Sequence, residues 1–154
     1  MQYVQTACKS SETCIFCAKP QASDDEKNLI LFRDKTCFVL MNLFPYNAGH
    51  LMVAPYKHTG EMNDLTDQEL ADLMLLARRS RQLLAAVLKP EGFNIGLNLG
   101  RTAGAGIEEH LHVHIVPRWN GDTNFMPVLG ETRVIPDALE SMYRRLKAGI
   151  ASPA

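Results

Sequence analysis

The stretch His110-Leu111-His112-Val113-His114-Ile115-Val116-Pro117 alternates histidine with aliphatic residues. In a β-strand, residues i, i+2 and i+4 share one face, so the three imidazoles should line one side while Leu111, Val113 and Ile115 pack on the other. A lone histidine in a strand is usually a half-buried side chain with a satisfied ring. Three in register need partners for three polar rings, and they repel one another when protonated. The pattern therefore predicts a site for metal binding, phosphate binding, or nucleophilic and acid–base catalysis.

Composition and charge limit the class of protein. A length of 154 residues, with 46% hydrophobic and 21% charged residues, is typical of one globular domain with a sizeable core. A formal net charge of -1 offers no attraction to nucleic acid or to an anionic membrane. No apolar run approaches a membrane span, and the N-terminus lacks a basic region followed by an apolar one. We expect one domain, residues 1–154, in the cytoplasm, with no nucleic acid or membrane partner.

The four cysteines of a cytoplasmic chain should be thiols or metal ligands rather than disulfides. Two of them, Cys14 and Cys17, form a Cys-x-x-Cys pair, which supplies two of the four ligands that a structural zinc site needs. The pair alone has two other interpretations, a redox pair and two unrelated thiols. A metal site is about as probable as these two together.

Hydrophobic patterning predicts an antiparallel sheet covered by helices. A long helix should begin at the capping box Thr66-Asp67-Gln68-Glu69 and run to about Lys89, where Pro90 stops it. A last helix should begin near Pro136-Asp137. Strands are predicted over residues 29–32, 37–41, 50–54, 93–99 and 110–117. This order predicts an α+β fold, in which the long helix and the C-terminal helix pack on an antiparallel sheet of about five strands.

A glycine-rich loop, residues 100–106, leads directly into the histidine stretch. Glycine lets backbone amides approach a phosphate closely, although such a loop is weak evidence when it stands alone. Its position beside three histidines strengthens the case. We therefore predict that Gly104, Ala105 and Gly106 lie against a bound phosphate.

The histidine stretch resembles the signature of the histidine triad (HIT) family of nucleotide hydrolases and transferases, in which three histidines alternate with apolar residues. The block from Asn42 to Pro55 is similar to a second block of that family, which contains a Gly-His-aliphatic strand. The resemblance covers about residues 14–119, with an irregular segment at 1–13 and a C-terminal extension at 120–148. Residues 117–125 most resemble the bacterial diadenosine tetraphosphate (Ap4A) phosphorylase branch.

This resemblance implies a nucleotide-binding enzyme that cleaves dinucleoside polyphosphates such as Ap4A at the α-phosphate. It implies that His112 is the nucleophile and forms a nucleotidyl-histidine intermediate. His114 would bind the phosphate or the leaving oxygen, and His50 would orient these rings. Inorganic phosphate or water would accept the nucleotidyl group, so the small-molecule partners would be AMP, ATP and Ap4A.

The resemblance also implies substrate contacts. Asn42 stands where the family holds the ribose hydroxyls, and Asn98 matches a polar position near the phosphates. Three apolar residues match positions that line the nucleobase pocket: Ile15, Phe16 and Leu43. For Phe16 and Leu43, plain core packing explains the residue type equally well. For Asn98 the alternative is an asparagine that caps its own turn.

A structural zinc ion is a further implication of the resemblance. Zinc-containing relatives suggest four ligands here, Cys14, Cys17, His58 and His110, with Cys8 as the runner-up. Two cysteines and two histidines close a tetrahedral shell, so the ion would not be catalytic. No organic cofactor is implied. Most relatives pair through the long helix and a sheet edge, which implies a homodimer.

The loop before the histidines departs from the family pattern. Many members carry Gln-Ser or Gln-Thr there, whereas residues 103–109 contain no glutamine, are one residue longer, and lack the small hydroxyl residue of the phosphorylase branch. The loop should leave room for phosphate, which favours phosphorolysis over hydrolysis. Two other functions stay open: a nucleoside phosphoramidate hydrolase or nucleotidyltransferase, and a non-catalytic zinc-stabilised nucleotide-binding module.

Overall fold

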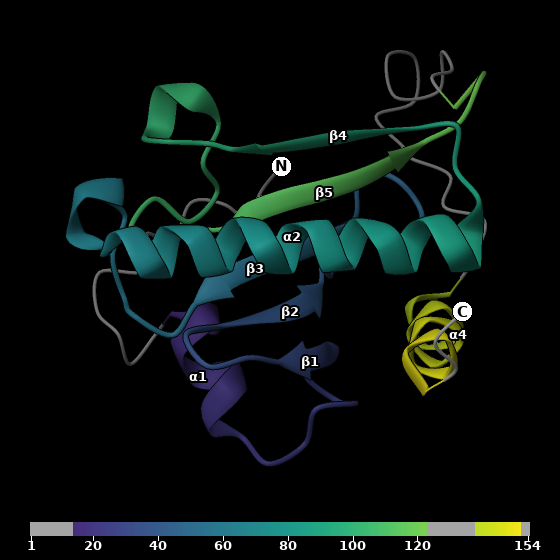
Figure 1. The fold of residues 1–154 in the computed structure, drawn as a ribbon, viewed down its shortest axis with the longest axis horizontal. Helices are drawn as coiled ribbons and strands as arrows, with labels where there is room; N and C mark the ends of the chain where they lie inside the picture. The colour runs from purple at the N-terminus through teal and green to yellow at the C-terminus, as the bar shows by residue number, and fades with distance from the viewer. Residues whose placement is uncertain (1–13, 123–137, 152–154) are drawn as a thin grey trace.

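A five-stranded antiparallel sheet organises the computed structural model, which describes residues 14–122 and 138–151 (Figure 1). The strands lie in the order β1-β2-β3-β5-β4, and every neighbouring pair is antiparallel. Their bounds are β1 Ile30–Arg33, β2 Cys37–Met41, β3 Leu51–Pro55, β4 Gly92–Leu97 and β5 Val113–Arg118. The predicted α+β class is confirmed.

Helices cover both faces of this sheet. The long helix α2 (Asp67–Leu88) and the last helix α4 (Leu139–Ala151) pack on one face, and the short helix α1 (Ile15–Gln21) packs on the other (Figure 1). Strand β2 shows the division, because Val39 belongs to the apolar cluster of α2 while Phe38 belongs to that of α1. All five residues of β2 are buried, as expected for a strand with both faces covered.

The long helix begins and ends as its sequence predicts. The Thr66 backbone N–H donates to Glu69 Oε2 at 2.8 Å, and the Thr66 hydroxyl accepts from the Glu69 N–H at 3.2 Å. The helix ends at Leu88, and Lys89 follows in the left-handed region with φ of 50°. Its buried residues are Leu73, Leu76, Ala77, Ser80 and Leu84. One face of α2 therefore anchors the sheet that carries the histidines.

A close approach fixes the chain just before β3. Gly49 has φ of +76°, and a Cβ added there would lie 2.5 Å from Leu88 Cδ1. Only glycine combines this backbone conformation with so little space. The contact holds the start of β3, and so the backbone of His50, against the end of α2.

Strand β5 begins at Val113, three residues later than predicted. His110 and His112 lie in the segment that leads into the strand, where the Leu111 N–H donates to the Thr59 carbonyl at 2.7 Å instead of joining the β3 ladder. The predicted alternation still holds. Leu111 and Val113 pack in the cluster of α2, while His114 pairs in register with Met52, a residue of the α1 cluster.

Helix α1 is a difference from the sequence analysis, which expected only a Cys-x-x-Cys motif and a solvated connector from Pro20. The Cys14 carbonyl accepts from the N–H groups of Cys17 at 3.0 Å and Ala18 at 2.9 Å. A seven-residue helix is unstable alone. Here the buried side chains of Phe16 and Cys17 hold it on the sheet.

Three predictions fall on residues outside the described part of the chain: the irregular segment 1–13 with Cys8, the helix start at Pro136-Asp137, and the end of the phosphorylase-like stretch, 123–125. Among the helices of the described residues, none combines the length and the apolar character that crossing a membrane requires.

Candidate functional site

Three histidines meet on the α1 face of the sheet, where β3 and β5 are paired, and we call them the imidazole cluster: His50, His112 and His114. His50 Nε2 lies 2.9 Å from His114 Nδ1. The ring centroids of His112 and His114 are 4.7 Å apart, and those of His50 and His114 are 5.1 Å apart. The structure therefore brings together the three residues predicted to be catalytic.

Hydrogen bonds assign the protons of two of these rings. The Tyr46 backbone N–H donates to His50 Nδ1 at 3.1 Å, and the Asn42 side-chain amide nitrogen lies 3.3 Å from the same atom. Because Nδ1 accepts, the proton of neutral His50 sits on Nε2 and is donated to His114 Nδ1. The proton of His114 is then on its own Nε2, which makes that atom a hydrogen-bond donor.

His112 has the opposite arrangement. Its Nδ1–H donates to the His110 backbone carbonyl at 2.8 Å. Nε2 therefore keeps its lone pair, and no other described residue forms a hydrogen bond with it. The ring is 7% exposed and packs on Phe16, with centroids 4.7 Å apart. This tautomer suits a nucleophile.

Burial keeps the two neighbouring rings uncharged at neutral pH. Desolvation lowers the pKa of His112, against the smaller opposing effect of its hydrogen bond to the His110 carbonyl. Desolvation, with a smaller contribution from His112, lowers the pKa of His114 to about 4. A neutral His112 can attack phosphorus, and a neutral His114 can still donate from Nε2.

The residues expected to bind nucleoside differ in exposure. Ile15 and Leu43 are 42% and 50% exposed, whereas Phe16 is 1% exposed and packs against the rings of His110 and His112. Phe16 is therefore buried, as core packing predicts. Leu43 is exposed, so core packing does not explain it. Asn42 Oδ1 accepts from the Phe44 N–H at 3.0 Å, so Asn42 shapes the loop that leads to His50.

The glycine-rich loop uses some of its amides in hydrogen bonds to its own carbonyl groups. The N–H of Gly104, which has φ of +88°, donates to the Arg101 carbonyl at 3.0 Å, and the N–H of Ala105 donates to the Gly100 carbonyl at 3.4 Å. Asn98 Nδ2 lies 3.5 Å from the Gly104 carbonyl, which fits the cap interpretation. The Gly104 N–H, which was predicted to face a phosphate, is thus already used in the loop. The Gly106 N–H makes no hydrogen bond within the described residues.

Four donor atoms converge beside the imidazole cluster, and we call them the Cys2His2 cluster: Cys14, Cys17, His58 and His110. All four atoms lie within 4.8 Å of one another. The Nδ1 atoms of the two histidines are 3.2 Å apart, and sulfur–nitrogen distances are 3.3, 3.4 and 3.6 Å. A tetrahedral zinc shell has nitrogen–nitrogen edges of about 3.3 Å and sulfur–nitrogen edges of about 3.6 Å. The donors therefore fit a zinc ion.

The outer hydrogen bond of His110 supports that fit. Its Nε2–H donates to the Pro55 carbonyl at 2.8 Å, so the Nδ1 lone pair is directed at the cluster. Burial lowers the pKa of His110 to about 4 and raises the pKa of Cys14 to about 12. Without a cation the thiol stays protonated, and an ion that binds must displace that proton.

A family model described as the HIT domain matches residues 23–121. This chain belongs to the HIT family. The family prediction from the histidine stretch is confirmed. The matched span contains the imidazole cluster, His58 and His110, whereas Cys14 and Cys17 precede it.

Relatives of this HIT chain include proteins with assigned activities. An AP-4-A phosphorylase of Mycobacterium tuberculosis is 49% identical over 127 residues, which are 82% of this chain and 65% of that protein. An asymmetrical bis(5'-nucleosyl)-tetraphosphatase of Schizosaccharomyces pombe is 36% identical over 93 residues, 60% of this chain and 50% of that protein. The chain thus spans about two thirds or less of the length of these curated relatives.

A solved structure of a zinc-bound histidine triad family protein from Mycobacterium smegmatis is also similar. It superimposes with a TM-score of 0.73 and 29% identity, over 92% of this chain and 96% of that one. The two structures therefore share one fold over most of the length of both chains.

Tyr46 is a site residue that the sequence analysis did not select. Besides its backbone bond to His50, its ring packs on His50 and His114, with centroids 4.6 and 5.8 Å apart. An aromatic residue four positions before the Gly-His strand of the second HIT block was the available signal.

A polar tie between two loops was also missed. Asn47 Nδ2 donates to Asp122 Oδ2 at 2.8 Å and to the Pro117 carbonyl at 3.1 Å, and Arg118 forms a two-bond ion pair with Asp122. Arg118 thus helps to hold the turn after β5 against the loop that leads to His50.

Proposed function

We propose that this HIT protein cleaves dinucleoside polyphosphates such as Ap4A at the α-phosphate, through a nucleotidyl group carried by His112. The hydrogen bond from His112 Nδ1–H to the His110 carbonyl is the observation that carries the proposal, because it leaves Nε2 as a free, uncharged nucleophile. The 49% identity with an AP-4-A phosphorylase supports the substrate class.

The reaction divides into two transfers. His112 Nε2 attacks the α-phosphorus, and the bond from that phosphorus to the oxygen bridging to the β-phosphorus breaks. From Ap4A this step yields adenylyl-histidine and ATP. The imidazole of the adduct is positively charged, and the His110 carbonyl stabilises it through Nδ1–H. His114 Nε2–H donates to a nonbridging or leaving oxygen, where negative charge develops.

Residues around the histidines hold the nucleotide in this proposal. Asn42 binds the ribose hydroxyls, and the exposed side chains of Ile15 and Leu43 contact the base. The buried ring of Phe16 packs against the ring of His112 and supports it. The loop of Asn98, Gly104, Ala105 and Gly106 borders the phosphates, with the Gly106 N–H as its available donor.

The second transfer delivers the adenylyl group to inorganic phosphate and gives ADP. The segment from Gly104 to Gly106 carries no long side chain, which leaves room for an anion beside the α-phosphorus. Of the three amides in this segment, only that of Gly106 is open to the anion, because the N–H groups of Gly104 and Ala105 are engaged. Phosphorolysis still has the support of the phosphorylase relative, and hydrolysis is the competing outcome.

Product analysis tests both steps. Purified protein is incubated with Ap4A, with and without labelled inorganic phosphate, and the nucleotides are separated. Label in ADP supports phosphorolysis. Formation of AMP and ATP at a rate indifferent to phosphate means hydrolysis, with His112 still the nucleophile. AMP binding without turnover of Ap4A or of a nucleoside phosphoramidate would leave only a nucleotide-binding module.

We further propose that the Cys2His2 cluster holds one structural zinc ion. The donor set and its spacing fit zinc, and a zinc-bound HIT structure is among the similar folds. Four protein ligands leave no position for substrate, so the ion ties α1 to the sheet and does not take part in the reaction. Metal analysis of the purified chain should find about one zinc per chain.

A homodimer is the remaining proposal. Strand β4 lies at the edge of the sheet, and three apolar residues on β4 and α2 are about half exposed: Ile95, Met74 and Leu75. An open strand edge beside apolar side chains can pair with its own copy around a twofold axis. Light scattering at micromolar concentration should give twice 17.2 kDa, and a mass of 17.2 kDa would argue against pairing.

A further inference from the structure

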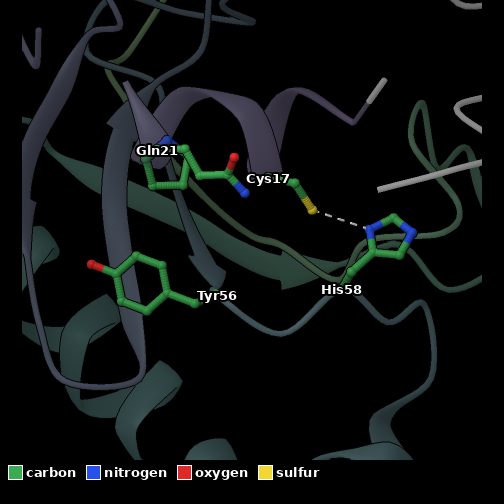
Figure 2. A pocket seen from close by; sticks show the side chains of 5 residues that line it. Cys17, Gln21, Tyr56 and His58 are labelled. Atoms are coloured by element: carbon green, nitrogen blue, oxygen red, sulfur yellow. Dashed lines mark hydrogen bonds between the residues drawn. The ribbon is translucent and has the colours of Figure 1, made fainter. Parts of the chain in front are cut away.

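A pocket of about 320 Å³ opens beside the Cys2His2 cluster (Figure 2), and no residue of the imidazole cluster lines it. One wall is a single face of α1, formed by Cys17, Pro20 and Gln21 at helical spacings of three and four. The other wall is Tyr56 and His58, from the end of β3 and the loop that follows. Figure 2 shows Cys17 Sγ directed at the His58 ring between these walls.

The four donor residues are unequal in their access to this pocket. Cys17 and His58 line it, and Cys17 is 8% exposed. Cys14 and His110 do not line it, and both are 0% exposed. An ion in the cluster can therefore be reached from the edge between Cys17 and His58.

We infer that this pocket is the port through which the metal ion of the Cys2His2 cluster enters and leaves, with Cys17 and His58 as its first and last ligands. The inference rests on the zinc proposal above. Entry ends when Cys14 and His110 close the shell from the buried side. Departure begins when an incoming ligand replaces Cys17 or His58, because these are the two of the four donor residues that line the pocket.

The size of the pocket suits this role. A water molecule occupies about 30 Å³ in the liquid, so a metal ion with about six waters needs roughly 200 Å³. The pocket of about 320 Å³ can admit such an ion, or one arm of a small chelator with thiolate or carboxylate donors. No shift of the helix is required for either to reach Cys17.

The walls of the pocket are held in place. Arg33 Nη1 donates to the Pro20 carbonyl at 2.7 Å, and its Nη2 pairs with Asp25 at 2.7 Å, which pins the end of α1. On the other wall, Tyr56 stacks on Phe38 at 5.2 Å. The side chain of Gln21, by contrast, is exposed and forms no hydrogen bond with another described residue, so it can be exchanged without the loss of one.

The test measures zinc release from the zinc-loaded protein to a chromophoric chelator, 4-(2-pyridylazo)resorcinol. Gln21→Trp narrows the port and should slow release several-fold, while Gln21→Ala widens it and should speed release. Ala18→Trp is the matched control, because Ala18 is exposed on the same helix and does not line the pocket. Its release rate should equal that of the unchanged protein.

A second readout uses the thiols themselves. Brief treatment of the zinc-loaded protein with N-ethylmaleimide, followed by tandem mass spectrometry, should find Cys17 modified before Cys14. The port proposal would be wrong if Cys14 were modified first, or if zinc were released at the same rate from both Gln21 variants. The zinc proposal would still stand. Protein that never retains zinc would overturn both, so the two failures are distinguishable.

Discussion

The imidazole cluster and the Cys2His2 cluster lie on one face of one sheet, yet their polar atoms are satisfied in different ways. In the imidazole cluster, the Nδ1 atoms of His50 and His114 each meet an N–H, that of Tyr46 and that of His50, while His112 Nε2 stays open. In the Cys2His2 cluster, two Nδ1 atoms face each other at 3.2 Å, beside two sulfur atoms. The first cluster orders its rings with protein atoms alone, and we expect the second to reach its full stability only with a cation.

This difference shows that the hydrogen bonds around a histidine decide its chemistry. His110 and His112 are two residues apart and are both buried. His110 Nε2–H donates to the Pro55 carbonyl and Nδ1 points at the thiols, while His112 Nδ1–H donates to the His110 carbonyl and Nε2 stays open. The two carbonyl groups thus separate the proposed metal ligand from the proposed nucleophile.

Loss of the nucleophile should have the largest effect. His112→Ala removes the lone pair that attacks phosphorus, so Ap4A turnover should fall by about three orders of magnitude or more. AMP binding and zinc content should change little, because the remaining contacts are kept. Steady-state assays with metal analysis measure both, and a variant with a near-normal rate would remove His112 from the mechanism.

Loss of a metal ligand should instead destabilise the fold. Cys17→Ser should reduce zinc content well below one per chain. The unfolding temperature should fall by about 10 °C, since a structural ion contributes several kcal/mol and each is worth about 2–4 °C in a chain of this size. Scanning calorimetry measures the shift.

A matched control for that variant is Cys37→Ala, which alters a buried thiol in β2 outside the cluster. It should keep its zinc. If both variants lost the ion equally, the Cys2His2 assignment would be untenable.

Loss of a positioning residue should have an intermediate effect. His50→Ala leaves His114 Nδ1 without its donor, so the proton on His114 is no longer confined to Nε2. We expect kcat to fall by about tenfold to a hundredfold, less than the loss of a direct charge-stabilising donor. KM for Ap4A should change little. A His50→Gln variant, which can still donate, should recover part of kcat. A change in KM alone would contradict this role.

The smallest effect concerns stability in acid. Burial holds the pKa of His114 at about 4, below the unfolded value of about 6.5. The unfolded chain therefore binds the extra proton first, and the contribution of the neutral ring, full above about pH 6.5, is lost as the pH falls toward 4. His114→Asn should lose less stability than the unchanged protein between about pH 6.5 and 5, by on the order of 1 kcal/mol.

Urea unfolding of zinc-loaded protein at several pH values measures this difference. Parallel pH profiles for the two proteins would mean that His114 is not the titrating group.

The sequence predicted those features that depend on periodicity. The alternation around His112 gave the correct face for each side chain, and the capping box at Thr66 gave the start of α2. Helix α1 was beyond such rules, since it is short, contains Pro20, and exists through the packing of Phe16. Tautomers and amide availability, as at Gly104, depend on distant carbonyl groups that no local pattern reveals. Residue contacts with substrate and zinc remain predictions.

His110 contributes to both clusters through different parts of the same residue: it is a member of the Cys2His2 cluster and a hydrogen-bond partner of the imidazole cluster. Its imidazole lies among the thiols, while its backbone carbonyl orients His112. A change of codon replaces a side chain but leaves the carbonyl in place. Under the two proposals above, a substitution at position 110 removes a metal ligand and leaves the proposed nucleophile, His112, aligned. The two properties can be gained or lost separately in evolution, although one residue serves both.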